Sequence, residues 1–183
     1  RIEVDEDATS VMNISFPVSQ VPGRVVIEAE HVTKAYGDKT ILKDISLLVE
    51  RSSKIAFVGQ NGQGKSTFMK AIVNEFKYQG SIKLGHNVQL GYFAQNQAAY
   101  LDGEITLLET MTNAATDTNR SRVRDMLGSF LFRGDDVDKK VKVLSGGERN
   151  RLALCKLLLQ PINVLVMDEH TNHLDIKSKN VLK

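Results

Sequence analysis

Gly59-Gln60-Asn61-Gly62-Gln63-Gly64-Lys65-Ser66 is the stretch that decides the fold of this 183-residue chain. It fits the pattern G-x-x-x-x-G-K-S/T at every position. A short apolar run, Lys54 to Val58, precedes it, and a helical pattern, Ser66 to Phe76, follows it. Glycines let the backbone wrap closely around a phosphate with its N–H groups pointing inward, and the N-terminus of the following helix adds positive potential. The stretch therefore predicts a phosphate-binding loop between a buried strand of a parallel sheet and a helix.

The side chains of the loop predict how a nucleotide would be held. Lys65 should reach the β and γ phosphates as a point charge, the Ser66 hydroxyl should ligate Mg²⁺, and Thr67 is placed for an α-phosphate contact. The alternative is a glycine-rich turn with an incidental lysine, but the full match and its flanks argue against it. The loop residues predicted to bind the nucleotide phosphates are Gly59, Asn61, Gly62, Gly64, Lys65, Ser66 and Thr67.

A second apolar run, Val164 to Met167, predicts a buried strand that ends in two acids, Asp168 and Glu169. At the carboxyl end of a parallel strand beside a phosphate loop, Asp168 would assist Mg²⁺. Glu169 would orient or deprotonate an attacking water. A solvated acidic turn is the alternative, and the neighbouring loop makes it the weaker interpretation. The two segments together predict a site that binds phosphates with Mg²⁺ and activates a water molecule.

Leu144-Ser145-Gly146-Gly147-Glu148 opens a helix that is expected to run to about Gln160. Ser145 with Glu148 three residues later predicts a capping box. Two consecutive glycines weaken a first helical turn, so they suggest that something approaches the backbone closely. Two interpretations stand together: the segment caps the helix, and Ser145, Gly146 and Gly147 present a second phosphate-binding surface.

Composition excludes several classes of protein. The 24 basic and 22 acidic side chains leave a net charge of +2, too small by itself to argue for nucleic-acid binding. The single cysteine, Cys155, excludes an internal disulfide framework and a multi-cysteine zinc site, and its apolar helical neighbours predict a buried thiol. There is no apolar stretch of the roughly 18 residues that span a bilayer, and the acidic start lacks the features of a secretion signal. We therefore expect a soluble globular chain without direct membrane insertion.

Patterning predicts an α/β fold that follows a linker tail at residues 1–24. Strands at 25–30 and 41–50, with turn chemistry between them, predict an N-terminal antiparallel β subdomain. The phosphate loop and the acidic strand end predict a P-loop NTPase core with a mostly parallel sheet, and further short strands are expected at 80–84 and 88–93. A helical subdomain at about 97–150 is expected to carry the Leu144–Glu148 segment. Its expected helices are 105–111, 123–132 and the one that starts at 146.

The order of the phosphate loop, Gln95, Leu144–Glu148 and Asp168-Glu169 resembles the nucleotide-binding domains of ATP-binding cassette (ABC) proteins over about residues 25–183. The resemblance implies that Tyr36 stacks on adenine and that Gln95 senses Mg²⁺ and the γ phosphate. It also implies that Ser145 and Gly147 contact ATP held by a partner cassette, so that two ATP molecules lie in a head-to-tail cassette dimer. The expected catalytic residues are Glu169, Lys65 and Gln95, and the expected Mg²⁺ residues are Ser66, Gln95 and Asp168.

Two segments, Glu148 to Leu154 and Thr171 to Asp175, are most similar to the ABC-F branch of that family. This resemblance implies a cytoplasmic ATPase of the translation machinery, with two cassettes in one chain and no membrane domain. The expected partners are ATP, a second cassette in the same chain or a homodimer, and the ribosome. Two alternatives remain: the ATP-binding subunit of an ABC membrane transporter, and a module that binds nucleotide without turnover.

The chain departs from the family pattern in two places. His170 stands where the family has proline, which bears on the aim of Glu169 and hence on the rate of hydrolysis. The family's switch histidine follows the Asp175 loop and is not found before Lys183. We therefore expect the second cassette of a longer protein, incomplete at its C-terminus, that binds Mg-ATP weakly and turns it over slowly or not at all. A metal pair of His170 and His173 is set aside, because no cysteine or further histidine lies near them.

Overall fold

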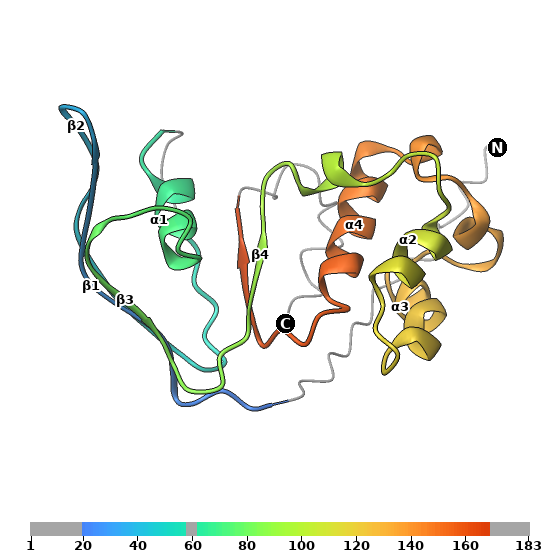
Figure 1. Ribbon diagram of the computed structural model, residues 1–183, viewed down its shortest axis with the longest axis horizontal. Helices are drawn as coiled ribbons and strands as arrows, with labels where there is room; N and C mark the ends of the chain where they lie inside the picture. The colour runs from blue at the N-terminus through green and yellow to red at the C-terminus, as the bar shows by residue number, and fades with distance from the viewer. Residues whose placement is uncertain (1–19, 58–61, 169–183) are drawn as a thin grey trace, which may run out of the picture. The chain divides into compact units, whose positions relative to one another are not determined.

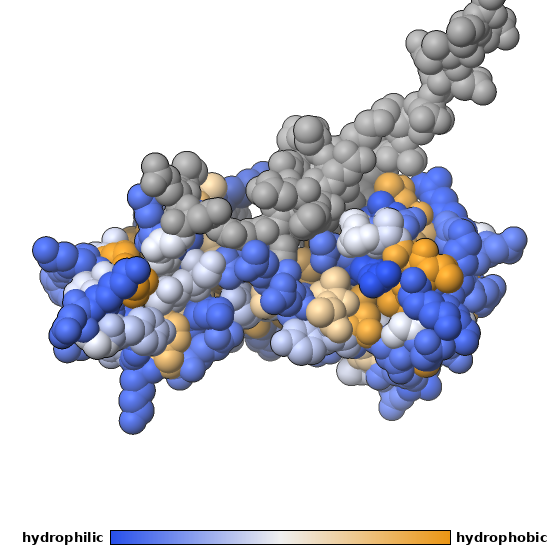
Figure 2. Space-filling view, turned by 90° about the horizontal axis from the view of Figure 1, so that it is seen from above, coloured by the Kyte–Doolittle hydropathy of each residue, from blue (hydrophilic) through white to orange (hydrophobic). Residues whose placement is uncertain are grey.

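The computed structural model of the chain describes residues 20–57 and 62–168 (Figure 1). These residues divide into two compact units that separate after Gln95 and after Leu159. One unit is rich in strands, and the other, Asn96–Leu159, is helical. None of the described helices is long and apolar enough to cross a membrane. The face drawn in Figure 2 is mostly hydrophilic, with hydrophobic residues in small groups.

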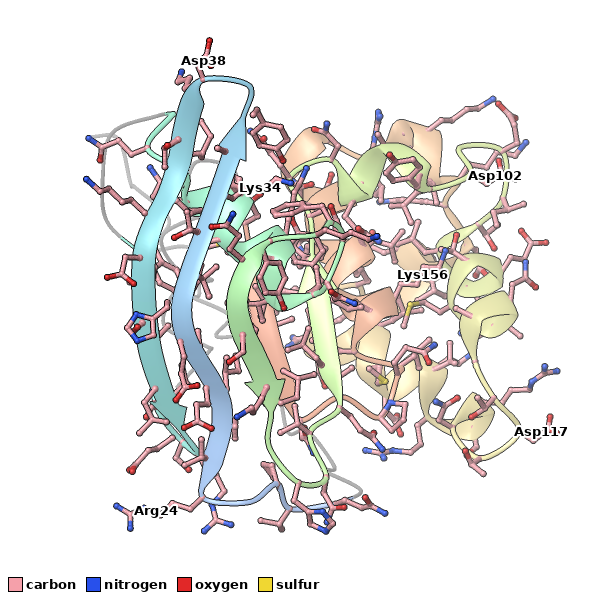
Figure 3. All side chains as sticks on the ribbon, turned by 60° about the vertical axis from the view of Figure 1, so that its left-hand side comes forward. Arg24, Lys34, Asp38, Asp102, Asp117 and Lys156 are labelled. Carbon is pink, nitrogen blue, oxygen red and sulfur yellow. The ribbon has the colours of Figure 1, made fainter. Side chains whose placement is uncertain are left out.

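The strand-rich unit is built on the hairpin that the sequence predicts. Strands β1 (Val25–Tyr36) and β2 (Lys39–Glu50) pair antiparallel, and Asp38 lies in the turn between them (Figure 3). Strand β3 (Gln79–Leu84) pairs with the other edge of β1, so the sheet order is β2-β1-β3. Alternate residues of these strands face one side of the sheet, where they form a core with α1. The buried members of that core are Val26, Ile27, Ala29, Val32, Leu42, Phe68, Ile72 and Val166.

Helix α1 (Lys65–Ile72) follows the phosphate loop, as predicted, but ends before the expected Phe76. Phe68 and Ile72 lie four residues apart on one helix face and are both buried against the sheet. The chain leaves the helix at Val73, and Asn74 adopts a left-handed φ of 58°. Asn is one of the few residues that adopts this conformation readily, so it stops the helix that apolar spacing alone would extend.

The parallel part of the fold is smaller than predicted. Strands β4 (Leu90–Phe93) and β5 (Val164–Met167) form a two-stranded parallel sheet, beside the three-stranded antiparallel one. The expected buried strand at 54–58 is wrong for residues 54–57, which form no strand, and Ile55 is 46% exposed. Val58 lies outside the described residues. A strand buried on both faces needs neighbours at its edges, and no described strand pairs with this segment, so its apolar run is insufficient by itself.

The helical unit confirms the predicted helices with shifted ends. Thr106 caps α2 through a capping box with Glu109. Helices α2, α3 and α4 pack around fully buried side chains, among them Leu107, Leu127 and Leu152. Its elements are the short 3-10 helices η1 (Gln97–Tyr100), η2 (Arg120–Arg122), η3 (Gly134–Asp138) and η4 (Val141–Val143), and the α-helices α2 (Leu107–Ala114), α3 (Val123–Ser129) and α4 (Gly146–Leu157).

Candidate nucleotide-binding site

Asp168 is fixed at the end of the parallel strand pair. Its backbone N–H donates to the carbonyl oxygen of Phe93 at 3.0 Å, which extends the pairing of β5 with β4 by one residue. The residue is only 2% exposed, one of two buried polar or charged residues in the part of the chain that the structure describes. Burying a carboxylate is costly unless it has partners, so its surroundings carry chemical information.

The first partner is Ser66, in the first turn of α1. The Ser66 hydroxyl donates to Asp168 Oδ1 at 2.7 Å, across 102 residues of sequence. Two of the three residues predicted for Mg²⁺ therefore lie in direct contact. A carboxylate oxygen and a hydroxyl oxygen are the donor types that Mg²⁺ accepts when it is bound with a nucleotide. The donor set fits that ion.

The second partner is Tyr92, which sequence reasoning missed. Its hydroxyl donates to the other carboxylate oxygen, Asp168 Oδ2, at 3.3 Å. Burial, and then the negative charge of Asp168, raise the pKa of the Tyr92 hydroxyl well above its ordinary value, so it remains a proton donor at neutral pH. A signal was available: if β4 and β5 pair in parallel with Tyr92 opposite Val166, Tyr92 lies on the same face as Asp168.

The described end of the phosphate loop packs against strand β2. Gly64 has a φ of +86° and is the N-cap of α1, a left-handed conformation that favours glycine. A Cβ atom built on it would lie 2.9 Å from the Ile41 carbonyl oxygen and 3.1 Å from Leu42 Cδ2. Lys65 and Thr67 follow in the first helical turn and are half-buried. Glycine at 64 is therefore required both by its φ and by the close approach of β2.

Tyr36 lies at the end of β1, on the same hairpin whose second strand meets the phosphate loop. It is 55% exposed, and its ring packs edge-on against Phe76 with the centroids 6.4 Å apart. Lys34 Nζ lies 4.8 Å from the centroid of each of these rings. An exposed aromatic ring held by neighbours is suited to stacking, as the resemblance predicts, and its contact with adenine stays a prediction.

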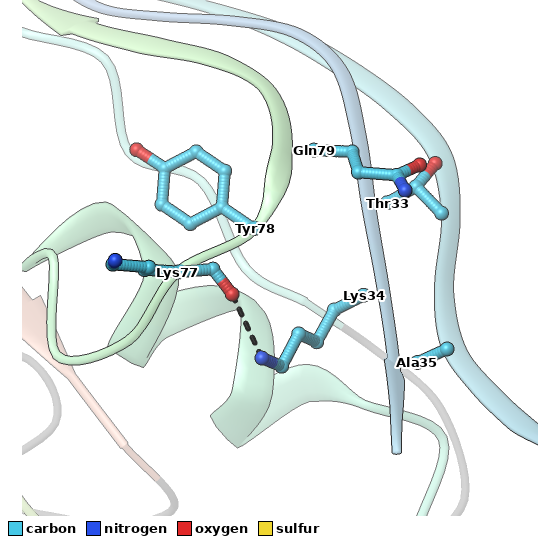
Figure 4. A pocket seen from close by; sticks show the side chains of 6 residues that line it. All are labelled: Thr33, Lys34, Ala35, Lys77, Tyr78 and Gln79. Atoms are coloured by element: carbon cyan, nitrogen blue, oxygen red, sulfur yellow. Dashed lines mark hydrogen bonds between the residues drawn. The ribbon is translucent and has the colours of Figure 1, made fainter. Parts of the chain in front are cut away.

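A pocket of about 380 Å³ is lined in part by Lys34, the same residue whose Nζ lies over these two rings (Figure 4). Lys34 Nζ donates to the Lys77 carbonyl oxygen at 2.7 Å within the pocket wall. The pocket contains none of the predicted site residues. Its lining residues are Thr33, Lys34, Ala35, Lys77, Tyr78 and Gln79.

Gln95 is exposed in the turn that follows β4. Since β4 and β5 are parallel, Gln95 follows the same edge of this sheet at which Asp168 follows β5. Its predicted contact with Mg²⁺ and the γ phosphate stays a prediction. Gly59, Asn61 and Glu169, and the two histidines His170 and His173, lie outside the described residues.

The Leu144–Glu148 segment belongs to the helical unit and has the predicted capping box. Ser145 Oγ accepts from the Glu148 N–H at 3.3 Å, and Glu148 Oε2 accepts from the Ser145 N–H and hydroxyl, each at 2.8 Å. These bonds lower the pKa of the Glu148 carboxyl. A Cβ on Gly146 would meet no described atom within 4 Å. The chain's own packing thus does not demand glycine there, which leaves room for a ligand to approach.

Two other titratable side chains, Cys155 and His31, are described by their own surroundings. Cys155 is fully buried in α4, and burial raises the pKa of its thiol, which confirms the predicted core position. His31 is exposed, and its Nδ1 lies 2.6 Å from Asp44 Oδ1. Within residues 20–57 and 62–168, no group of three or more His, Cys, Asp or Glu side chains is arranged to hold a metal ion.

Known proteins are similar to this chain over most of its length. The sequence profile of the ABC transporter family matches residues 42–172. The chain is 45% identical over 174 residues to ABC transporter F family member 5 of Arabidopsis thaliana, covering 94% of this chain and 25% of that protein. It is 41% identical over 173 residues to the putative ATP-binding protein YdiF of Bacillus subtilis, covering 93% and 27%. The probable ATP-binding protein YbiT of Escherichia coli O157:H7 is 39% identical over 183 residues, covering 97% and 34%.

The chain therefore spans between about a quarter and a third of the length of these relatives. A solved structure, that of an ATP-binding subunit of an ABC transporter, superposes with a TM-score of 0.69 at 23% identity, covering 86% of this chain and 71% of the other. That likeness shows the ABC ATPase fold. Since the family profile matches most of the chain and the relatives at 39–45% identity include F-family proteins, this chain belongs to the ABC transporter family as an ATP-binding cassette ATPase domain that resembles the ABC-F branch.

Proposed function

We propose that this cassette binds Mg-ATP and, in the natural protein that carries it, hydrolyses ATP to ADP and phosphate in a head-to-tail pair of cassettes. The observation that carries the proposal is the contact between Ser66 Oγ and Asp168 Oδ1 at 2.7 Å. It joins the end of the phosphate loop to the acid at the end of β5, and these are the two segments from which the sequence predicts nucleotide chemistry.

Each residue of the site has a separate role in the proposed reaction. Lys65 and the backbone of the loop hold the β and γ phosphates, and Ser66 and Asp168 hold the metal ion. Gln95 contacts the metal ion and the γ phosphate. Bound Mg²⁺ neutralises charge that develops on the phosphates. Glu169 positions the attacking water and takes its proton. Tyr36 stacks on the adenine ring.

The Leu144–Glu148 segment completes the site of a partner cassette in this proposal. Ser145 and Gly147 would contact the γ phosphate of ATP bound by the partner, at the N-terminus of α4. Gly146, where a Cβ would meet no described atom within 4 Å, supports a surface that a ligand can approach. The Ser145 hydroxyl would turn its proton from Glu148 to the phosphate and keep accepting from the Glu148 N–H.

For the whole protein we propose a cytoplasmic ABC-F ATPase that acts on the ribosome. The identities of 45% and 42% to two F-family members of Arabidopsis thaliana support this role over that of a transporter subunit. Binding of the natural protein to ribosomes tests it, with Glu169→Gln to retain ATP. We expect ATP-dependent co-sedimentation with ribosomes, and its absence would count against the ribosomal role. Co-purification with a membrane protein would favour the transporter alternative.

Nucleotide binding has a sharper test in the 183-residue chain itself. Ser66→Ala removes a proposed metal ligand, and Ser129→Ala, in α3, removes an exposed hydroxyl that only donates to the Asp125 carbonyl at 3.0 Å. Equilibrium binding of a fluorescent ATP analogue with and without Mg²⁺ compares them. We expect Ser66→Ala to lose about tenfold or more of the affinity that depends on Mg²⁺ and Ser129→Ala to match the parent. Equal affinities in all three proteins would overturn the proposed site.

A further inference from the structure

The carboxylate of Asp168 is held from two sides by two neutral hydroxyls. Ser66, on α1, donates to Oδ1 at 2.7 Å, and Tyr92, on β4, donates to Oδ2 at 3.3 Å. The family resemblance gave roles to Ser66 and Asp168 but none to Tyr92. We propose that Tyr92 is a positioning residue, which orients Asp168 for the metal–nucleotide complex. This inference rests on the proposed binding of Mg-ATP.

The geometry of the strand pair makes the contact a consequence of the fold. Tyr92 pairs with Val166 and Phe93 pairs with Met167, so the register of the two parallel strands is defined up to their carboxyl ends. Asp168 is then tied to Phe93 by its backbone N–H at 3.0 Å. Since residues two apart on a strand lie on one face, Val166 and Asp168 share the face of Tyr92. The pairing of β4 with β5 therefore places the Tyr92 hydroxyl next to the Asp168 carboxylate.

Two donors restrain the carboxylate more than one donor does. With the Ser66 bond alone, the carboxylate can rotate about its Cβ–Cγ bond and exchange its two oxygens. The Tyr92 bond to Oδ2 opposes that rotation and keeps Oδ1 directed at Ser66. A ligand held in its bound orientation before the ion arrives loses less conformational freedom on binding.

The chemistry of the hydroxyl also suits this role. Asp168 is 2% exposed, so it needs hydrogen-bond donors to replace water. A lysine or arginine at position 92 would supply donors but would also neutralise the acid and compete with a cation. A tyrosine hydroxyl is neutral, so the carboxylate keeps its full negative charge for a metal ion. Residues that orient a ligating carboxylate in this way commonly affect metal affinity by about 10- to 100-fold.

Tyr92→Phe tests the proposal because it removes the hydroxyl and keeps the ring. The matched control is Tyr100→Phe, which removes a hydroxyl from a side chain in η1 that is 79% exposed. Binding of Mn²⁺, as a spectroscopic substitute for Mg²⁺, is followed by electron paramagnetic resonance with ATP present. The affinity for ATP is measured separately in EDTA, and thermal unfolding by circular dichroism checks both variants.

We expect Tyr92→Phe to weaken Mn²⁺ binding in the presence of ATP by about tenfold and to leave the affinity for metal-free ATP unchanged. Tyr100→Phe should match the parent in both measurements. Unchanged Mn²⁺ binding in Tyr92→Phe would overturn the proposal. An equal loss with and without metal, or a variant that does not fold, would also overturn it, because either result shows a purely structural role. Failure of the parent chain to bind Mn-ATP would instead refute the proposed function.

Discussion

Two glycines in the phosphate loop allow a controlled test of how the loop is packed. Gly62 and Gly64 have similar left-handed φ values, +82° and +86°. Alanine at either position costs ~1–2 kcal/mol, because its Cβ crowds the backbone in that conformation. At Gly62 the new Cβ would meet no described atom within 4 Å, so we expect Gly62→Ala to lose only this amount.

Gly64→Ala should lose the same amount of stability through its backbone conformation and a further amount through steric overlap. Its Cβ would lie 2.9 Å from the Ile41 carbonyl oxygen, which is backbone, and 3.1 Å from Cδ2 of Leu42, which is 1% exposed. Neither atom can move without disturbing β2 or the core, and such overpacking costs a further ~1–3 kcal/mol. The free energy of unfolding should therefore fall by ~2–5 kcal/mol in Gly64→Ala.

Urea denaturation followed by circular dichroism measures both variants, and thermal unfolding provides a second readout. In a chain of this size each kcal/mol corresponds to ~2–4 °C, so Gly64→Ala should melt ~2–12 °C below Gly62→Ala. Equal destabilisation of the two variants would show that β2 does not constrain the loop. A larger effect at Gly62 would refute the packing described for this part of the site.

Three further predictions concern other parts of the chain. Ser145→Ala should lower the free energy of unfolding by ~1 kcal/mol, measured by urea denaturation, because α4 loses its N-cap. The hydrogen bond that His31 donates to the Asp44 carboxylate raises the pKa of His31 above 6.5. The pair therefore stabilises the fold below pH 6.5, and its contribution disappears as the pH rises through the raised pKa. Urea titrations between pH 6 and 8 should show this slope in the parent and not in Asp44→Asn. Cys155, fully buried, should react with a thiol reagent only after urea unfolding, and rapid reaction of the folded chain would contradict its core position.

The sequence predicted correctly those elements that depend on residues close to one another in the chain. The β1–β2 hairpin follows from period-two alternation around a turn, and the capping box at Ser145 follows from the spacing of two side chains. The N-terminus of α1 was set by Gly64, whose φ only glycine adopts freely. The C-terminus of α1 was predicted too late in the sequence, because the apolar spacing continues past Asn74, where the backbone adopts a left-handed conformation.

Features that depend on distant pairing were predicted less well. Residues 54–57 have the composition of a buried strand, but burial requires neighbouring strands, which a local pattern does not report. Tyr92 was overlooked for a related reason: its role depends on the register between β4 and β5, which lie about 70 residues apart in sequence. Ser66 and Asp168 were both assigned to one predicted Mg²⁺ site because the chemistry of phosphate binding calls for both, and the structure has them in contact although 102 residues separate them.

The two motif segments are each organised within their own unit, and this bears on what ATP would do. Ser145 and Glu148 satisfy one another at the start of α4, and Ser66 and Tyr92 satisfy Asp168 in the strand-rich unit. Because these hydrogen bonds are internal to the chain, ATP binding in the proposed pair of cassettes would use little of its binding energy to order these residues. That energy remains available to hold the two cassettes together, and hydrolysis, which removes the shared γ phosphate, would release them.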